Sequence, residues 1–93
     1  MLVAASALPE SLFWRQNVGV GVTATRQVVR FGTTGQADLL GCLRGRAVAI
    51  ETKVGKRGLT EKQKKWRAAF VRAGGFYIVG RSVEQVLREL ALA

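Results

Sequence analysis

The chain has 93 residues, 48% of them hydrophobic, which suits one folded domain over residues 1–93 and is too short for two. Fifteen Lys and Arg against six Asp and Glu give a net charge of +9, which favours a polyanionic partner, with nucleic acid preferred over an anionic membrane. The absence of histidine excludes Ser-His-Asp and Cys-His catalysis and His-ligated zinc, and a single cysteine excludes an internal disulfide.

The N-terminal part predicts a short helix and then two strands. Residues 1–11 hold the only proline and predict a short helical segment followed by a break. This start is apolar but short and lacks basic residues, so we expect neither a signal peptide nor a membrane span. Alternating Val and Gly predict a strand over 13–23, and a second strand is expected over 26–31, before a turn at 32–35.

Two apolar runs, 38–43 and 46–53, predict a β-hairpin with Arg44 and Gly45 between them. Counting outward from a two-residue loop places Asp38 opposite Glu51. A four-residue loop keeps this register, whereas a three-residue loop breaks it. Because side chains alternate along a strand, Lys53 shares the face of Glu51.

The C-terminal half predicts a helix, a strand and a second helix. Thr60 and Gln63 fit a capping box at the start of the first helix. Its apolar residues recur at helical spacing, at Trp66, Ala69, Phe70 and Ala73, before a Gly-Gly pair at 74–75. A short strand over 76–80 and a final helix after Ser82 follow. The order, roughly (α)-β-β-β-β-α-β-α, predicts an α/β domain built on one mixed sheet.

Asp38 and Glu51 are the acidic residues that local structure does not explain. Strands disfavour Asp, and facing or buried carboxylates are costly without a partner. A divalent cation between them removes this cost, and so does protonation of one of them. With no histidine or cysteine cluster, that cation would be Mg²⁺ or Mn²⁺. An ordinary cross-strand ion cluster with Lys53 is the alternative that needs no metal.

The motifs in this region resemble those of a nuclease family. The residues Gly35-Gln36-Ala37-Asp38, the hairpin and Ile50-Glu51-Thr52-Lys53 resemble the PD-(D/E)xK nuclease core. With Leu59-Thr60-Glu61-Lys62-Gln63, the segment 74–79 and the final helix, the sequence more narrowly resembles virus-type replication-repair nuclease (VRR-NUC) domains over about residues 13–90. This resemblance implies a restriction-endonuclease-like mixed sheet flanked by helices. It also implies a metal-dependent DNA endonuclease, similar to homodimeric resolvases of four-way (Holliday) junctions.

The resemblance also implies roles for individual residues. Asp38, Glu51 and the backbone carbonyl of Thr52 would bind Mg²⁺ or Mn²⁺, and Lys53 would orient the attacking water and stabilise the developing charge. Gln63 would contact the metal or the scissile phosphate, although a capping box explains it equally well. The usual proline before the aspartate is Ala37 here. Family members also carry a metal-site glutamate near the N-terminus, for which Glu10 is the candidate; the alternative is that this acid is missing.

The basic residues after the hairpin predict a DNA-binding surface. Phosphate contacts are expected from Lys56, Arg57, Lys62, Lys64, Lys65 and Arg67, although a solvated helix face also explains the last four. No base-reading motif is visible, which favours recognition of branched DNA and disfavours a sequence-specific restriction-type nuclease. We expect a cytoplasmic, DNA-associated bacterial or phage protein without a small-molecule cofactor. The alternative is a non-catalytic nucleic-acid-binding protein that keeps the nuclease fold with an incomplete metal site.

Overall fold

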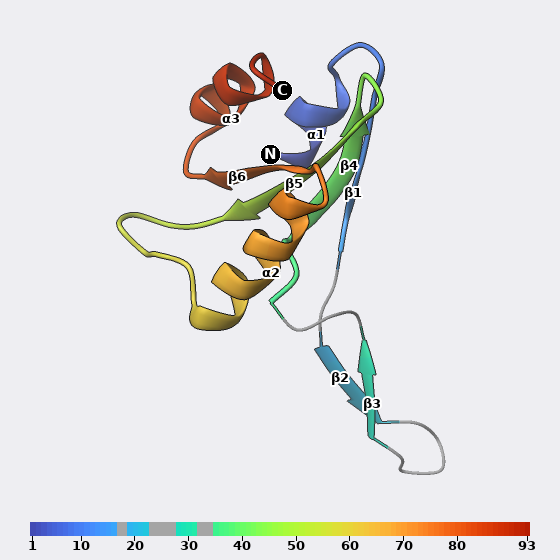
Figure 1. The fold of residues 1–93 in the computed structure, drawn as a ribbon, viewed down its shortest axis with the longest axis vertical. Helices are drawn as coiled ribbons and strands as arrows, with labels where there is room; N and C mark the ends of the chain where they lie inside the picture. The colour runs from blue at the N-terminus through green and yellow to red at the C-terminus, as the bar shows by residue number, and fades with distance from the viewer. Residues whose placement is uncertain (17–18, 23–27, 32–34) are drawn as a thin grey trace.

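The structure, a computed structural model, describes residues 1–16, 19–22, 28–31 and 35–93 (Figure 1). In chain order its elements are α1 (Leu2–Ser6), β1 (Ser11–Arg15), β2 (Gly19–Val22), β3 (Val28–Phe31), β4 (Leu39–Leu43), β5 (Arg46–Thr52), α2 (Glu61–Arg72), β6 (Phe76–Gly80) and α3 (Val83–Leu90).

Four of the strands form one mixed sheet in the order β1-β4-β5-β6. The β1/β4 and β4/β5 pairs are antiparallel, and β5 and β6 are parallel. Parallel neighbours need a crossover connection, and α2 supplies it. The predicted α/β class, with a mixed sheet and flanking helices, is therefore confirmed.

The single strand expected over 13–23 is wrong, because this segment contributes to two sheets. β1 pairs with β4, whereas β2 pairs with β3 in a separate antiparallel sheet. The strand predicted over 26–31 is present as β3, and residues 26 and 27 lie outside the described residues. Most of the expected turn at 32–35 also lies outside them. In Figure 1 the β2–β3 pair lies beyond the end of the sheet at which β1 ends and β4 begins.

The β4–β5 hairpin has the predicted two-residue loop. Arg44 and Gly45 both have positive φ, 48° and 82°, as a type I′ turn requires. The first pair after the turn is Leu43 with Arg46, and the last pair of the ladder is Leu39 with Ile50. The register counted from the sequence is confirmed.

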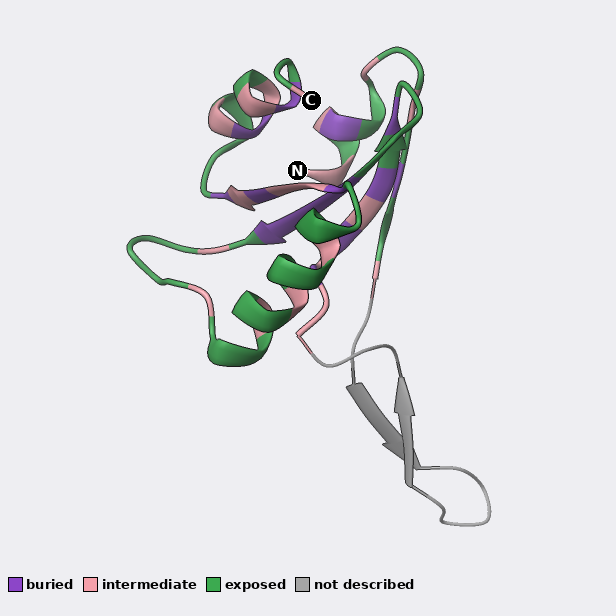
Figure 2. Cartoon of the chain, in the orientation of Figure 1, coloured by how far each residue is buried: buried purple, intermediate pink, exposed green. Residues whose placement is uncertain are grey.

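The helices cover the two faces of the sheet in different ways. α1 and α3 lie together on one face, where the core is formed by Ala5, Phe13, Leu39, Leu43, Val48, Ile50, Ile78, Val86 and Leu90. α2 lies on the other face against β6, and none of its residues is buried (Figure 2). Since side chains alternate along β5, the residues next to Val48 and Ile50, namely Ala49 and Glu51, point to the α2 side.

The helix caps follow the sequence prediction. Thr60 and Gln63 form the capping box of α2, and the Ser82 side chain accepts a hydrogen bond from the Gln85 N–H at the start of α3. Trp66 stacks on Phe70 one turn later, with ring centroids 4.9 Å apart. No helix of the described segments is long and apolar enough to cross a membrane.

Candidate active site

The hairpin brings two carboxylates together on the α2 side of the sheet. Asp38 directly precedes β4, and Glu51 lies near the end of β5, one step beyond the last ladder pair. The Asp38 Oδ2 atom accepts hydrogen bonds from the Thr52 N–H, at 3.0 Å, and from the Thr52 hydroxyl. Thr52 therefore fixes the orientation of the Asp38 carboxylate beside Glu51.

Glu51 is a buried carboxylate with an oxygen that no donor of the described residues satisfies. Its side chain is 4% exposed, and its Oε1 atom has no hydrogen-bond partner. Burial raises the pKa of Glu51 to about 7, with further contributions from the charge of Asp38 and a hydrogen bond with it. The positive charge of Lys53 acts in the opposite direction. The two carboxylates therefore repel each other, and a proton or a bound cation offsets such repulsion.

Lys53 lies close to Glu51 but is not paired with it. Its backbone N–H donates to the Gly80 carbonyl, at 3.0 Å, which places Lys53 where β5 and β6 both end. Across the described residues, the ion pair present is Lys64 with Glu61, at 3.4 Å. The ordinary ion cluster of Lys53 with the two acids is not formed.

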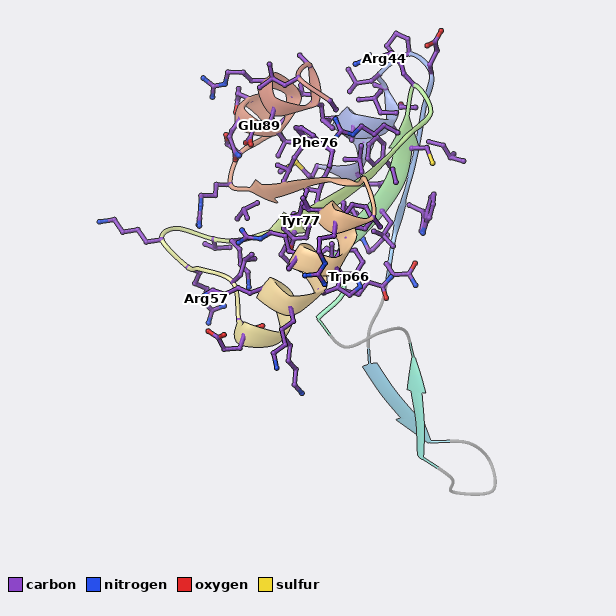
Figure 3. All side chains as sticks on the ribbon, viewed as in Figure 1. Arg44, Arg57, Trp66, Phe76, Tyr77 and Glu89 are labelled. Carbon is purple, nitrogen blue, oxygen red and sulfur yellow. The ribbon has the colours of Figure 1, made fainter. Side chains whose placement is uncertain are left out.

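Tyr77 and Arg67 complete the surroundings of Glu51. The Tyr77 hydroxyl is buried without a hydrogen-bond partner, and burial, followed by the charge of Glu51, raises the pKa of Tyr77 to about 12. The Arg67 guanidinium lies 6.0 Å from the Tyr77 ring centroid, and the ring centroid of Trp66 lies 6.1 Å away (Figure 3). Sequence reasoning placed Arg67 among the phosphate contacts but missed Tyr77.

Gln63 serves the cap of α2. Its Oε1 atom accepts the Thr60 N–H at 2.9 Å, and its own N–H donates to the Thr60 hydroxyl at 3.2 Å. The loop before Asp38 nevertheless packs against this turn, because a Cβ at Gly35 would lie 2.7 Å from the Lys62 carbonyl carbon. The capping interpretation of Gln63 is confirmed, and the position of its turn near Asp38 is compatible with a role at the site.

Glu10 does not join the two carboxylates. Its carbonyl accepts the Arg44 N–H at 2.9 Å, so Glu10 lies at the turn of the β4–β5 hairpin. Figure 3 shows Arg44 and Arg57 well apart, on different sides of the four-stranded sheet and its helices. At about 3.3 Å per strand residue, the five steps from Arg46 to Glu51 separate the turn from the acids by roughly 17 Å. The structure therefore does not bring Glu10 to Asp38 and Glu51, because Glu10 precedes β1 at the end of the sheet where the hairpin turns.

The donors present still fit a hard divalent cation. No group of three or more His, Cys, Asp or Glu side chains occurs in the described segments, which contain all six acidic residues of the chain. Mg²⁺, however, is commonly held by one or two carboxylates, with water and substrate phosphate filling the other positions. Asp38 and Glu51 meet this requirement. The N–H of Thr52 points toward Asp38, and in an extended strand the carbonyl of the same residue faces the same neighbour.

The expected phosphate-binding residues are exposed on two adjoining segments. Lys56 and Arg57 follow Lys53 in the loop before α2, and the others lie on α2 at Lys62, Lys64, Lys65 and Arg67. A residue that sequence reasoning missed, Arg81, donates to the carbonyls of Gly55 and Arg57, each at 2.7 Å. No local sequence signal identifies it, because a turn after β6 contacts a loop more than twenty residues earlier.

Comparison with known proteins adds no relative. No protein-family model matches the chain, and a search of curated proteins finds no significantly similar sequence. The resemblance to VRR-NUC domains stays a prediction from the motifs.

Proposed function

We propose that this protein is a Mg²⁺- or Mn²⁺-dependent DNA endonuclease with a restriction-endonuclease-like domain of the VRR-NUC type. The observation that carries the proposal is the buried Glu51 carboxylate, which has an unpartnered oxygen and lies beside Asp38. Each of two adjacent carboxylates makes ionisation of the other less favourable, and a bound cation offsets this repulsion. If the two carboxylates had only a structural role, an ion pair with Lys53 would be expected to offset their charge.

Each residue of the proposed site has a physical role. Asp38, Glu51 and the Thr52 carbonyl would hold the cation, and Thr52 orients Asp38 through its N–H and hydroxyl. When bound, the cation neutralises phosphate charge and lowers the pKa of a water molecule. The Lys53 ammonium orients that water and stabilises negative charge developing on the phosphate. No histidine is needed for this chemistry.

The surface supports a DNA substrate held by its backbone. The exposed lysines and arginines of the 54–58 loop and α2 follow Lys53 in the sequence, and α2 covers the face of the sheet to which Glu51 points. Phosphate contacts of this kind give affinity without base readout, so we propose selectivity for DNA shape, such as a four-way junction. Symmetric cutting of a junction requires two sites, which implies a homodimer.

Cleavage assays with matched variants test the proposal. Four-way junctions, flaps, plain duplex and single strands are incubated with Mg²⁺ or Mn²⁺, and products are resolved on denaturing gels. Asp38→Asn and Lys53→Ala are each expected to lower cleavage about 100-fold or more, as losses of a metal ligand or of transition-state stabilisation do. Arg88→Ala, at an exposed residue of α3 outside the proposed DNA-binding surface, is the control and is expected to cleave nearly as the wild type.

Cleavage that survives Asp38→Asn would overturn the assignment of the site. A wild-type protein that binds these substrates but cuts none of them would support a second function, a non-catalytic nucleic-acid-binding protein that keeps the fold. The position of Glu10 is the observation that favours this alternative, because it leaves the pair without a third acid.

A further inference from the structure

A short basic loop connects the candidate active site to α2. This basic loop, residues 54–58, follows Lys53 directly and contains two glycines around Lys56 and Arg57. Gly55 has a positive φ of 61°, and the Arg57 N–H donates to the Val54 carbonyl at 3.3 Å. An exposed loop of this composition has little of its own to fix its shape. Contacts from outside the loop must therefore define it.

Arg81 supplies those contacts from the turn between β6 and α3. Its two terminal nitrogens donate separately to the carbonyls of Gly55 and Arg57, each at 2.7 Å. This length is typical of charge-assisted hydrogen bonds, which are about twice as strong as neutral ones. The planar guanidinium reaches two acceptors at once, which an ammonium on a flexible stem does not reproduce. The two acceptor carbonyls belong to the residue before Lys56 and to Arg57, so Arg81 binds the loop on both sides of Lys56.

The position of Arg81 is itself fixed by its neighbours. Its backbone N–H donates to the Gln85 Oε1 atom at 2.7 Å, and the Gln85 Nε2 atom donates to the Val79 carbonyl at 2.9 Å. The preceding residue, Gly80, accepts the Lys53 N–H. A continuous set of hydrogen bonds therefore runs from α3 through Arg81 to the loop that begins at the catalytic lysine of the proposed site.

We propose that Arg81 is a positioning residue that holds the basic loop in the conformation that binds the phosphate backbone of DNA beside Lys53. The proposal rests on the proposed function, because it takes DNA as the ligand of the loop. An ordered loop loses less conformational entropy when Lys56 and Arg57 meet phosphates, so affinity increases without additional contacts. Arg81 acts through the loop carbonyls, and its charge alone does not explain the effect.

Two variants separate positioning from charge. Arg81→Lys keeps the charge and loses the planar fork, whereas Arg81→Gln loses both. Arg88, an exposed residue of α3 for which the structure shows no hydrogen bond, is the control, as Arg88→Lys and Arg88→Gln. Circular dichroism and thermal unfolding verify that each protein folds. Arg81 is exposed, and its replacement leaves the core unchanged.

The first measurement is the rate at which trypsin cleaves after Lys56 and Arg57 in the protein without DNA or metal. Mass spectrometry identifies and quantifies the fragments. The carbonyl of the Arg57–Gly58 bond is an acceptor of Arg81, so its release exposes this bond. The second is the Kd for a four-way junction in EDTA. For Arg81→Lys we expect cleavage of the loop to be about tenfold faster and the Kd about tenfold higher, corresponding to the loss of one charge-assisted hydrogen bond.

An Arg81→Lys protein with wild-type protection of the loop, or with wild-type affinity beside a weaker Arg81→Gln, would overturn the proposal, because charge alone would then account for Arg81. Equal effects in the Arg88 variants would overturn it as well. Neither measurement requires cleavage of DNA. Failure of the proposed nuclease activity is therefore a separate result, seen in the wild-type cleavage assay.

Discussion

At the scale of single residues, Glu51 combines the lowest exposure of any acidic side chain in the described part of the chain with an unsatisfied oxygen. Burial, followed by the negative charge of Asp38, opposes ionisation of Glu51 and raises its pKa to about 7. The folded protein therefore holds this proton to near neutral pH, whereas the unfolded chain releases it near 4.5. The contribution to stability is fully present below pH 4.5 and is lost as the pH rises through about 7.

Stability in EDTA is expected to fall between about pH 5 and pH 8 by up to about 3 kcal/mol, at about 1.36 kcal/mol per unit of pKa difference. Glu51→Gln removes the titrating group and should flatten this part of the profile, while Glu84→Gln, at the exposed start of α3, should leave it unchanged. Urea unfolding at a series of pH values measures both. A Glu51→Gln protein with the wild-type slope would show that another group controls the dependence.

At the scale of elements, the hairpin was predictable from sequence because its register depends on a local turn of two residues. The position of Tyr77 was not, because α2 separates β5 from β6 and no local rule fixes the register of parallel strands. The break between β1 and β2 escaped prediction for a related reason: alternation reveals a strand but not its partner. Glu10 was predicted as a metal ligand only because it is a glutamate near the N-terminus. Its distance from Asp38 depends on the pairing of β1 with β4, which the sequence does not reveal.

The close approach of Gly35 to α2 gives a test at this scale. Gly35→Ala is unfavourable for two reasons. Its φ of 84° is strained for any residue with a side chain, and an added Cβ would lie 2.7 Å from the Lys62 carbonyl carbon. We expect a loss of about 1–3 kcal/mol in urea unfolding and weaker metal binding, because the loop that leads into Asp38 must move.

Gly58→Ala is the matched control for this substitution. An added Cβ there meets no atom within 4 Å, and stability should change by less than about 0.5 kcal/mol. Equal stability of the two alanine variants would contradict the packing role of Gly35.

At the scale of the whole molecule, the net charge of +9 surrounds a small acidic centre. Such a field increases the rate of encounter with a polyanion and makes binding dependent on salt. In the proposed function, the two acids would determine where along that polyanion a cation is held. Affinity and chemistry therefore depend on different residues, and substitutions should separate them.

The salt dependence of DNA binding measures this division. Replacing Lys56 and Arg57 together by Gln is expected to reduce the slope of log Kd against log salt by about two, one for each phosphate that is no longer neutralised. Arg44→Gln changes the charge at the hairpin turn, well apart from Arg57 in Figure 3, and should not alter the slope. Fluorescence anisotropy between low and moderate salt gives both values. Equal slopes for the three proteins would place the bound DNA elsewhere.

The two-residue turn at Arg44 and Gly45 has a consequence for how this chain tolerates insertions and deletions. The turn lies far from the acids, yet its length determines which residues of β5 stand opposite the start of β4. One added residue that is not absorbed as a longer loop would shift the pairing by one and turn Glu51 into the apolar layer beneath α1 and α3, although the insertion itself lies outside the site. Because both of its residues have positive φ, the turn is expected to accept Gly, Asn or Asp more readily than β-branched residues. Length changes that shift the register are expected to remove the site, as a deep insertion and deletion scan would record.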